Sequence, residues 1–199
     1  MIPVVQGKTP LLVDARRKTD IQQVIAFKQR NPNIKVVLLY ATEGWRIADE
    51  LAANNIGVIL DPESNLPYEF DQLAATLSNA GRLDKAGVNV AIGMETHNIR
   101  LARQQAGNAV ANGLPWERGL AALTLNVAKL YEVDAVVGSL EIGKQADLVI
   151  WSGDPLELTE RAEQVFIQGE KINMESRQTK LRDRYLKLNT GKPHQFIRP

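Results

Sequence analysis

Side chains that can bind a metal or move a proton follow four short apolar runs of this sequence. They are Asp14, Tyr40, Glu43, Asp61, Glu95 and His97. Carboxylates and a neutral imidazole are common ligands of divalent metals, and a bound metal lowers the pKa of its water toward ~7 so that hydroxide can attack a substrate. The loops that follow parallel strands are where β/α proteins place such chemistry. We therefore take these six residues as the candidates for a functional site.

Each candidate also has a purely structural interpretation. The chain has two histidines, His97 and His194, and a lone histidine at a strand–helix junction is also typical of a helix cap. With Asp14 and Glu95, His97 would make only a poor single-metal site. Tyr40 can be a packed aromatic with its hydroxyl at the rim, and a charged loop residue such as Asp61, which precedes a proline, is common in turns.

The elements that must position these residues alternate between β-type and helical patterns. Strands are expected near 11–13, 34–39, 57–60 and 88–92, and helices follow each of them, with Thr19 or Asp20 as the first cap and Thr42 as the next. A long helix is expected over 99–112, and another begins at Pro115. This alternation predicts parallel β/α architecture.

Four β/α units cannot close an eight-stranded barrel. They can form a half (β/α) barrel, a small open sheet, or one half of a barrel that another chain completes. From Gly138 the pattern changes: strands are expected at 139–141 and 147–151, a hairpin at 165–171, and a surface helix over 176–188. We therefore divide the chain into a half barrel (1–135), β-sandwich strands (136–175) and a C-terminal helix with its tail (176–199).

Composition excludes several classes of protein. The 199 residues carry a formal net charge of +1, so we expect no nucleic-acid partner and no binding to an anionic membrane. No stretch approaches the ~18 apolar residues that span a bilayer, so we expect a soluble protein. The absence of cysteine excludes disulfides and thiolate metal sites, and it leaves the compartment open between cytoplasm and periplasm.

The most specific segment is G-S-L-E-I-G-K-Q-A-D-L-V-I-W, residues 138–151, followed by Gly153-Asp154-Pro155-Leu156. It resembles the segment with which enzymes of the amidohydrolase superfamily leave their barrel for a small flanking β-sandwich. Residues 106–115 and 121–128 resemble the last barrel helices of the imidazolonepropionase-like metal-dependent hydrolases, and 165–169 resembles the next sandwich strand. Because these stretches occur in the family's order, the sequence is similar to the C-terminal half of this superfamily. Its Gly143–Asp147 is expected to be a tight turn in which Asp147 accepts hydrogen bonds from backbone amides.

The resemblance implies that the four expected strands correspond to barrel strands five to eight. It also implies a hydrolase of C–N bonds, in non-peptide or cyclic amides, that uses zinc or another divalent metal on a small-molecule substrate. In this register Asp14 and Tyr40 stand where the family has histidines. Glu95 stands near the aspartate that acts as metal ligand and general base, and its extra methylene shifts the carboxylate by ~1 Å, which can cost about a hundredfold in rate.

The residue roles implied by the resemblance follow directly. Glu95 is the catalytic candidate; Asp14, Glu95 and His97 are the metal-ligand candidates; and Glu43, Asp61 and Tyr40 are the substrate-facing candidates.

Three interpretations are open at this point. The chain is a fragment or one half of a metal-dependent hydrolase, a noncatalytic relative that acts as a scaffold or partner subunit, or a truncated sequence whose N-terminal half is missing. A half barrel exposes two strand edges and an apolar inner face. We therefore expect the chain alone to be inactive and to self-associate.

Overall fold

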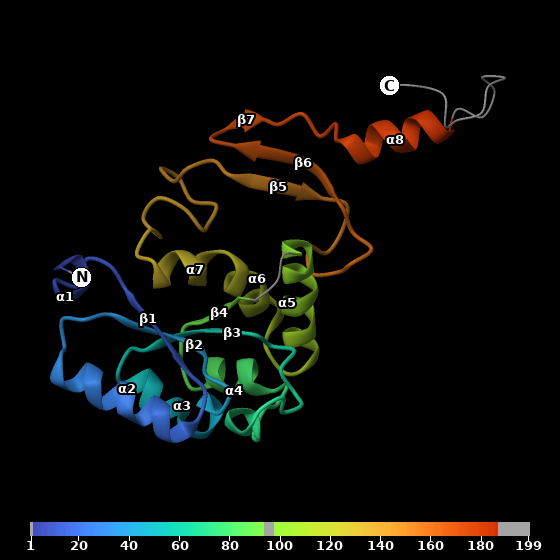
Figure 1. The fold of residues 1–199 in the computed structure, drawn as a ribbon. Coiled ribbons are helices and arrows are strands. Elements are labelled where there is room, and N and C mark those ends of the chain that lie inside the picture. The colour runs from blue at the N-terminus through green and yellow to red at the C-terminus, as the bar shows by residue number, and fades with distance from the viewer. Residues whose placement is uncertain (1, 94–97, 187–199) are drawn as a thin grey trace.

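The computed structural model describes residues 2–93 and 98–186, which form two β-sheets with helices around the larger one (Figure 1). The parallel sheet consists of β1 (Leu11–Ala15), β2 (Val36–Tyr40), β3 (Gly57–Leu60) and β4 (Val90–Ile92). The antiparallel sheet consists of β5 (Leu148–Trp151), β6 (Ala162–Ile167) and β7 (Glu170–Lys171). The helices are α1 (Ile2–Val5), α2 (Lys18–Arg30), η1 (Gly44–Ile47), α3 (Ala48–Ala53), η2 (Phe70–Gln72), α4 (Asn79–Lys85), η3 (Ile99–Leu101), α5 (Ala102–Ala111), α6 (Trp116–Leu123), α7 (Leu125–Leu130) and α8 (Arg177–Leu186). The predicted mixed α/β class with a parallel sheet is confirmed.

The four parallel strands follow one another in sequence order, β1-β2-β3-β4. Each strand therefore pairs with the next one along the chain, and the helix between them must cross over the sheet. Right-handed crossovers that always step in one direction leave their helices on one face, and Figure 1 shows α2, α3 and α4 together on one side of the sheet. Because the strands run parallel, their carboxyl ends all meet at one edge, and the loops that carry the candidate residues meet there.

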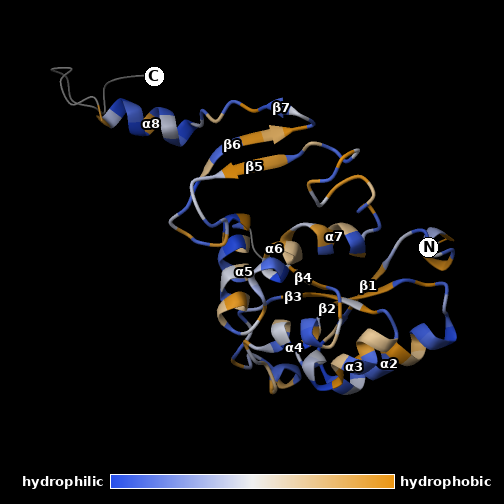
Figure 2. Ribbon diagram, turned by 180° about the vertical axis from the view of Figure 1, so that it is seen from behind, coloured by the Kyte–Doolittle hydropathy of each residue, from blue (hydrophilic) through white to orange (hydrophobic). Residues whose placement is uncertain are grey.

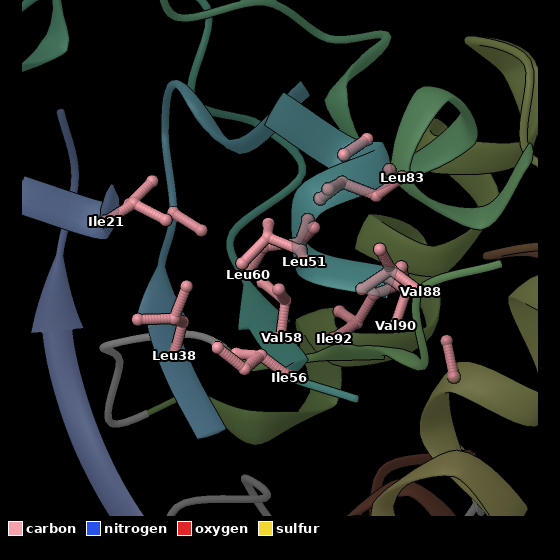
Figure 3. Close-up of a cluster of buried hydrophobic side chains, with 14 of the residues drawn as sticks. Ile21, Leu38, Leu51, Ile56, Val58, Leu60, Leu83, Val88, Val90 and Ile92 are labelled. Carbon is pink, nitrogen blue, oxygen red and sulfur yellow. The ribbon is translucent and has the colours of Figure 1, made fainter. Parts of the chain in front are cut away.

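The main core lies between the sheet and these helices (Figure 3). Alternate residues of the central strands point toward it, as the period of two in a strand requires. These strand residues meet the apolar sides of α2, α3 and α4. The fully buried members of the main core include Ile21, Leu38, Leu51, Val58, Leu60, Leu83 and Val90.

The opposite face of the sheet is covered by α7 over its middle. Leu130 packs there against Val37 and Ala91, and the Asn126 side chain donates a 2.7 Å hydrogen bond to the backbone carbonyl of Val90. At β1 this face is open, since Leu12 is 40% exposed. The parallel sheet is thus fully covered on one face and partly covered on the other.

The segment before the antiparallel sheet differs from the prediction. Residues 139–141 form no strand but lead into a turn at 142–143, where Ser139 and Glu141 bond to each other and to Lys144. Asp147 accepts a 2.7 Å hydrogen bond from the backbone amide of Gln168. This aspartate therefore holds the β6–β7 turn, whereas the sequence suggested amides of its own turn.

The antiparallel sheet is attached to the helical layer by the loop between β5 and β6. Leu156 of this loop is buried in the main core. The guanidinium of Arg103, on α5, donates to the carbonyls of Pro155 at 2.8 Å and Glu160 at 3.1 Å, and it lies 4.4 Å from the ring of Trp151. Figure 2 shows β5 and β6 in hydrophobic colours, yet Ile150 and Ile167 are about half exposed.

The described residues contain one antiparallel sheet, so the second layer that a β-sandwich needs is not seen among them. The domain boundaries at 135 and 175 stay a prediction.

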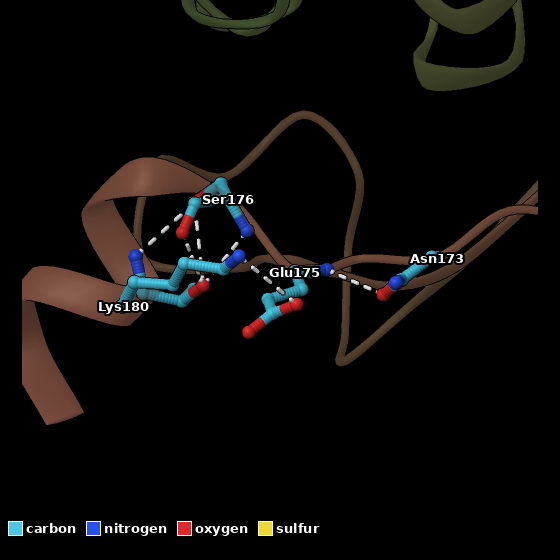
Figure 4. A network of polar contacts seen from close by, with 5 residues as sticks. Asn173, Glu175, Ser176 and Lys180 are labelled. Atoms are coloured by element: carbon cyan, nitrogen blue, oxygen red, sulfur yellow. Dashed lines mark hydrogen bonds and ion pairs between the residues drawn. The ribbon is translucent and has the colours of Figure 1, made fainter. Parts of the chain in front are cut away.

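The C-terminal helix α8 begins with a reciprocal cap (Figure 4). The hydroxyl of Ser176 accepts from the amide of Thr179 at 3.1 Å, and the amide of Ser176 donates to the hydroxyl of Thr179 at 2.8 Å. This arrangement satisfies amides that the first helical turn leaves unpaired. Across residues 2–93 and 98–186, no helix has the length and apolar character needed to cross a membrane.

Candidate functional site

A cavity of about 440 Å³ opens at the carboxyl ends of the parallel strands. The loops after β1, β2 and β3 and the helices α4 and α5 supply its walls. It is lined by Arg16, Tyr40, Thr42, Asp61, Glu63, Ser64, Tyr68, Gln72, Asn79 and Gln105. Two of the predicted substrate-facing residues, Tyr40 and Asp61, are therefore brought together, as the shared strand edge predicts. The lining is dominated by polar side chains, which suits a small polar ligand.

An arginine stands between the side chains at the ends of β1 and β2. The Nε of Arg16 donates to Asp14 Oδ1 at 3.3 Å, and its guanidinium carbon lies 4.3 Å from the centre of the Tyr40 ring. A second carboxylate, Asp71, lies 3.8 Å away. The hydrogen bond that Arg16 donates to Asp14 is the main reason why the pKa of Arg16 is raised above its ordinary value. The guanidinium of Arg16 thus contacts both Asp14 and Tyr40.

The backbone after β2 is strained beside this cluster. Tyr40 and Ala41 have positive φ angles of 68° and 39°, a region that side-chain-bearing residues rarely adopt. Strain of this kind persists only where the surroundings enforce it, and it is concentrated at functional sites. The residue after this turn is Thr42. It is the predicted cap of the second helix, but it lies in the lining of the cavity.

Asp61 is the acidic group at the end of β3. Its Oδ1 accepts a 2.9 Å hydrogen bond from the backbone amide of Glu63, which fixes the direction of the carboxyl group. Burial raises the pKa of Asp61 above its ordinary value, because removing water penalises the ionised form more than the hydrogen bond stabilises it. A half-buried carboxyl group at a strand end can hold or transfer a proton nearer to neutral pH than an exposed one can.

Glu43 has a structural partner. Its Oε2 accepts a 2.8 Å hydrogen bond from the backbone amide of Lys18, the first residue of α2, and its side chain is only 13% exposed. Neither Thr19 nor Asp20 caps that helix, so the predicted caps are wrong. A carboxylate from a distant loop replaces them and interacts favourably with the positive end of the helix. Glu43 lies outside the cavity lining, and its substrate-facing role stays a prediction.

Two amide side chains that the sequence did not single out complete the cavity. Asn79, on α4, and Gln105, on α5, are 7% and 3% exposed, and both line the cavity. Their side-chain oxygens have no hydrogen-bond partner within the part of the chain that the structure describes. Helical spacing held a signal for both, because Asn79 precedes Leu83 and Gln105 precedes Ala109 by four residues, which puts each amide on a buried face.

Glu95 and His97, predicted as catalytic residue and metal ligands, lie outside the described residues. Within residues 2–93 and 98–186, no three His, Cys, Asp or Glu side chains form a group that could hold a metal ion. The remaining predicted ligand, Asp14, is paired with Arg16. A guanidinium beside a carboxylate competes with a divalent cation for the same oxygens. The donors described at the ends of β1 and β2 therefore do not fit a divalent metal.

Comparisons with known proteins identify the family to which this architecture is similar. The model of the Amidohydrolase family matches residues 19–176. A curated 5-methylthioadenosine/S-adenosylhomocysteine deaminase from Moorella thermoacetica is 33% identical over 112 residues, which are 50% of this chain and 25% of that enzyme.

Solved structures agree with this match. An amidohydrolase from Thermotoga maritima MSB8 superposes with a TM-score of 0.79 at 30% identity, over 86% of this chain and 45% of that one. An adenosine deaminase from Xanthomonas campestris, solved with bound zinc, superposes with a TM-score of 0.56 at 22% identity, over 83% of this chain and 47% of that one. The latter likeness is one of fold alone.

This chain spans about a quarter of the curated deaminase and less than half of each of these two solved structures. The match nevertheless extends from α2 through the parallel sheet, the cavity and the antiparallel strands to Ser176, which is most of the sequence. The chain belongs to the amidohydrolase family.

Proposed function

We propose that this chain supplies the C-terminal half of a (β/α)₈ barrel whose reaction is hydrolysis of a C–N bond in a small molecule. The sequential strand order supports the half barrel. An open doubly wound sheet reverses its strand order at a switch point, whereas β1-β2-β3-β4 steps in one direction, as a barrel does. The open face of β1 and the outer edges of β1 and β4, which pair with no strand among the described residues, are then the surfaces that the other half completes.

The three-stranded antiparallel sheet is a separate part of the chain. We propose that it is one layer of the β-sandwich that flanks the barrel. The exposed Val149 and Ile167, which the strand register puts on the same face, would lie under the other layer, because an antiparallel sheet buries an apolar face against a second layer.

The observation that carries the proposed chemistry is the polar cavity at the carboxyl ends of the strands. In barrel enzymes this end holds the active site. Tyr40 and Asp61 face a bound substrate here, and Asp61, with its raised pKa, holds or moves a proton at its carboxyl group. Glu43 acts at a distance by fixing the start of α2. No step is assigned to a metal, since the described donors do not fit one.

Co-expression tests this proposal. The N-terminal half of the Thermotoga maritima amidohydrolase would be produced together with this chain. We expect a 1:1 complex in sedimentation velocity and release of ammonia from amino-bearing substrates, such as the 5-methylthioadenosine of the curated relative's name. Asp61→Asn should abolish the release of ammonia without causing the complex to dissociate. A chain that is a cooperative monomer and forms no such complex would refute the half-barrel assignment.

A second candidate function is supported by the Asp14–Arg16–Tyr40 cluster. We propose as the alternative a noncatalytic scaffold or partner subunit, in which Arg16 has replaced the metal as the cation at this place. The ammonia assay on the complex, together with metal analysis at saturating zinc, separates the two. Ammonia release favours the hydrolase, and no bound ion together with no ammonia release favours the scaffold.

A further inference from the structure

The cavity floor holds two acceptors that lack donors. Asn79 Oδ1 and Gln105 Oε1 are both buried and without a hydrogen-bond partner among the residues described. The orientation of the Asn79 amide is fixed, because its Nδ2 donates a 3.1 Å hydrogen bond to the backbone carbonyl of Ala41, which can only accept. Its oxygen is therefore turned away from that carbonyl.

Unsatisfied acceptors of this kind are uncommon in native proteins, and each calls for a partner. Asn79 and Gln105 both line a single cavity of about 440 Å³, which is large enough for a small molecule. A ligand that satisfies both must present N–H or O–H donors to this end of the cavity.

The charges around the cavity select the kind of donor. Asp61 and Glu63 contribute two carboxylates to the lining, and Arg16 is the one cation among the lining residues that the structure describes. Arg16 is itself paired with Asp14 and lies near Asp71, so its charge is compensated outside the cavity. The local field therefore favours a positively charged ligand over an anion. Tyr68 adds an aromatic ring to the lining, and such rings attract planar cations.

We propose that this cavity binds a cationic N–H donor group of a small molecule, an amidinium, guanidinium or ammonium. Asn79 Oδ1 and Gln105 Oε1 accept hydrogen bonds from its N–H groups, and the carboxylate of Glu63 supplies the opposite charge. The inference rests on the proposed function, since it names the chemical class that the substrate cavity takes. It also assigns Asn79 and Gln105, which the family resemblance did not indicate, as binding residues.

Three probes of one shape test the ligand class on the 199-residue chain. Benzamidine is cationic with four N–H donors, benzamide is neutral with two, and benzoate is an anion without any. Binding would be followed by chemical-shift changes of the side-chain amide groups of Asn79 and Gln105. We expect millimolar binding of benzamidine, weaker binding of benzamide and none of benzoate. Equal binding of the three probes, or a preference for benzoate, would overturn the proposal.

Paired variants test the residue. Gln105→Met keeps the shape of the side chain and removes its acceptor, and Gln104→Met makes the same change one position away on α5, outside the cavity lining. Loss of a hydrogen bond to a charged group should weaken benzamidine binding by about tenfold in Gln105→Met and leave it unchanged in Gln104→Met. Unchanged binding in a folded Gln105→Met variant overturns the role of this amide.

A third outcome concerns buried water. If no probe binds and Gln105→Met unfolds at lower denaturant than Gln104→Met does, the oxygen is satisfied by an internal water and the proposal fails. These outcomes are independent of catalysis. A chain that binds benzamidine but yields no active complex contradicts the proposed reaction, whereas an active complex with no probe binding contradicts only the ligand class.

Discussion

Gly81 lies where α4 meets the turn between α5 and α6, and Gly81→Ala should destabilise the protein. A Cβ atom there would lie 2.6 Å from the carbonyl oxygen of Gly113, 2.7 Å from its carbonyl carbon and 3.1 Å from the nitrogen of Leu114. Ordinary contacts begin near 3.4 Å, so the two backbones must separate by about 0.8 Å. The obstacle is rigid, because the Leu114 amide donates to Ala109 and its side chain is buried.

The magnitude follows from two opposed contributions. Overpacking of a well-packed contact costs about 1–3 kcal/mol, and replacing a helical glycine by alanine stabilises by about 1 kcal/mol. Because the obstacle is backbone, we expect the upper part of the packing range and a net loss of about 1–2 kcal/mol in the free energy of unfolding. Equilibrium unfolding in urea, followed by circular dichroism, measures this difference.

Gly119→Ala is the matched control. It is also a helical glycine, but its Cβ would meet one methyl group of Val110 at 2.6 Å, and a single side chain shifts more easily than a hydrogen-bonded backbone does. We expect this variant to stay within about 1 kcal/mol of the wild type. If Gly81→Ala were as stable as Gly119→Ala, α4 would not approach the Gly113 turn as described, and the position of Asn79 at the start of α4 would be in doubt as well.

Three further predictions concern the supports of the site. Glu43→Gln should lower the free energy of unfolding by about 1 kcal/mol, because a charged cap of α2 is lost. Urea unfolding of this variant is compared with that of Glu50→Gln, an exposed control on α3. Burial raises the pKa of Asp61, so the folded protein retains a proton that the unfolded chain releases, and this contribution to stability is present at acid pH and lost as the pH rises through the raised pKa. The stability of the wild type relative to Asp61→Asn should therefore fall from about pH 4 upward and then level off, and a pH-independent difference in urea would contradict the raised pKa. Arg103→Lys should cost about 1–2 kcal/mol, since lysine has a single nitrogen in place of the two guanidinium nitrogens that donate to the carbonyls of Pro155 and Glu160. Tryptophan fluorescence, to which Trp151 contributes, should report the loosened loop; an unchanged spectrum and stability would show that this contact does not hold the antiparallel sheet.

Part of the site could be predicted from the sequence because strand ends are visible in it. The apolar runs that end before Asp14, Glu43 and Asp61 locate the carboxyl edge of the sheet, and parallel strands necessarily bring these ends together. The motif at 138–151 indicated the family, which the match over 19–176 confirms. The amide of Gln105 was missed because its importance depends on which helix face meets the cavity.

The sequence by itself determined the alternation of strands and helices, their order and the type of side chain at each strand end, since these depend on local periodicity. Only the tertiary structure decided what those side chains do. Glu43 caps a helix that begins 25 residues earlier, Arg16 places its charge between Asp14 and Tyr40, and Asn79 and Gln105 meet in one cavity. Each of these depends on contacts between residues distant in the chain, and a hydrogen bond or a desolvated charge is defined by such neighbours rather than by its own position in the sequence.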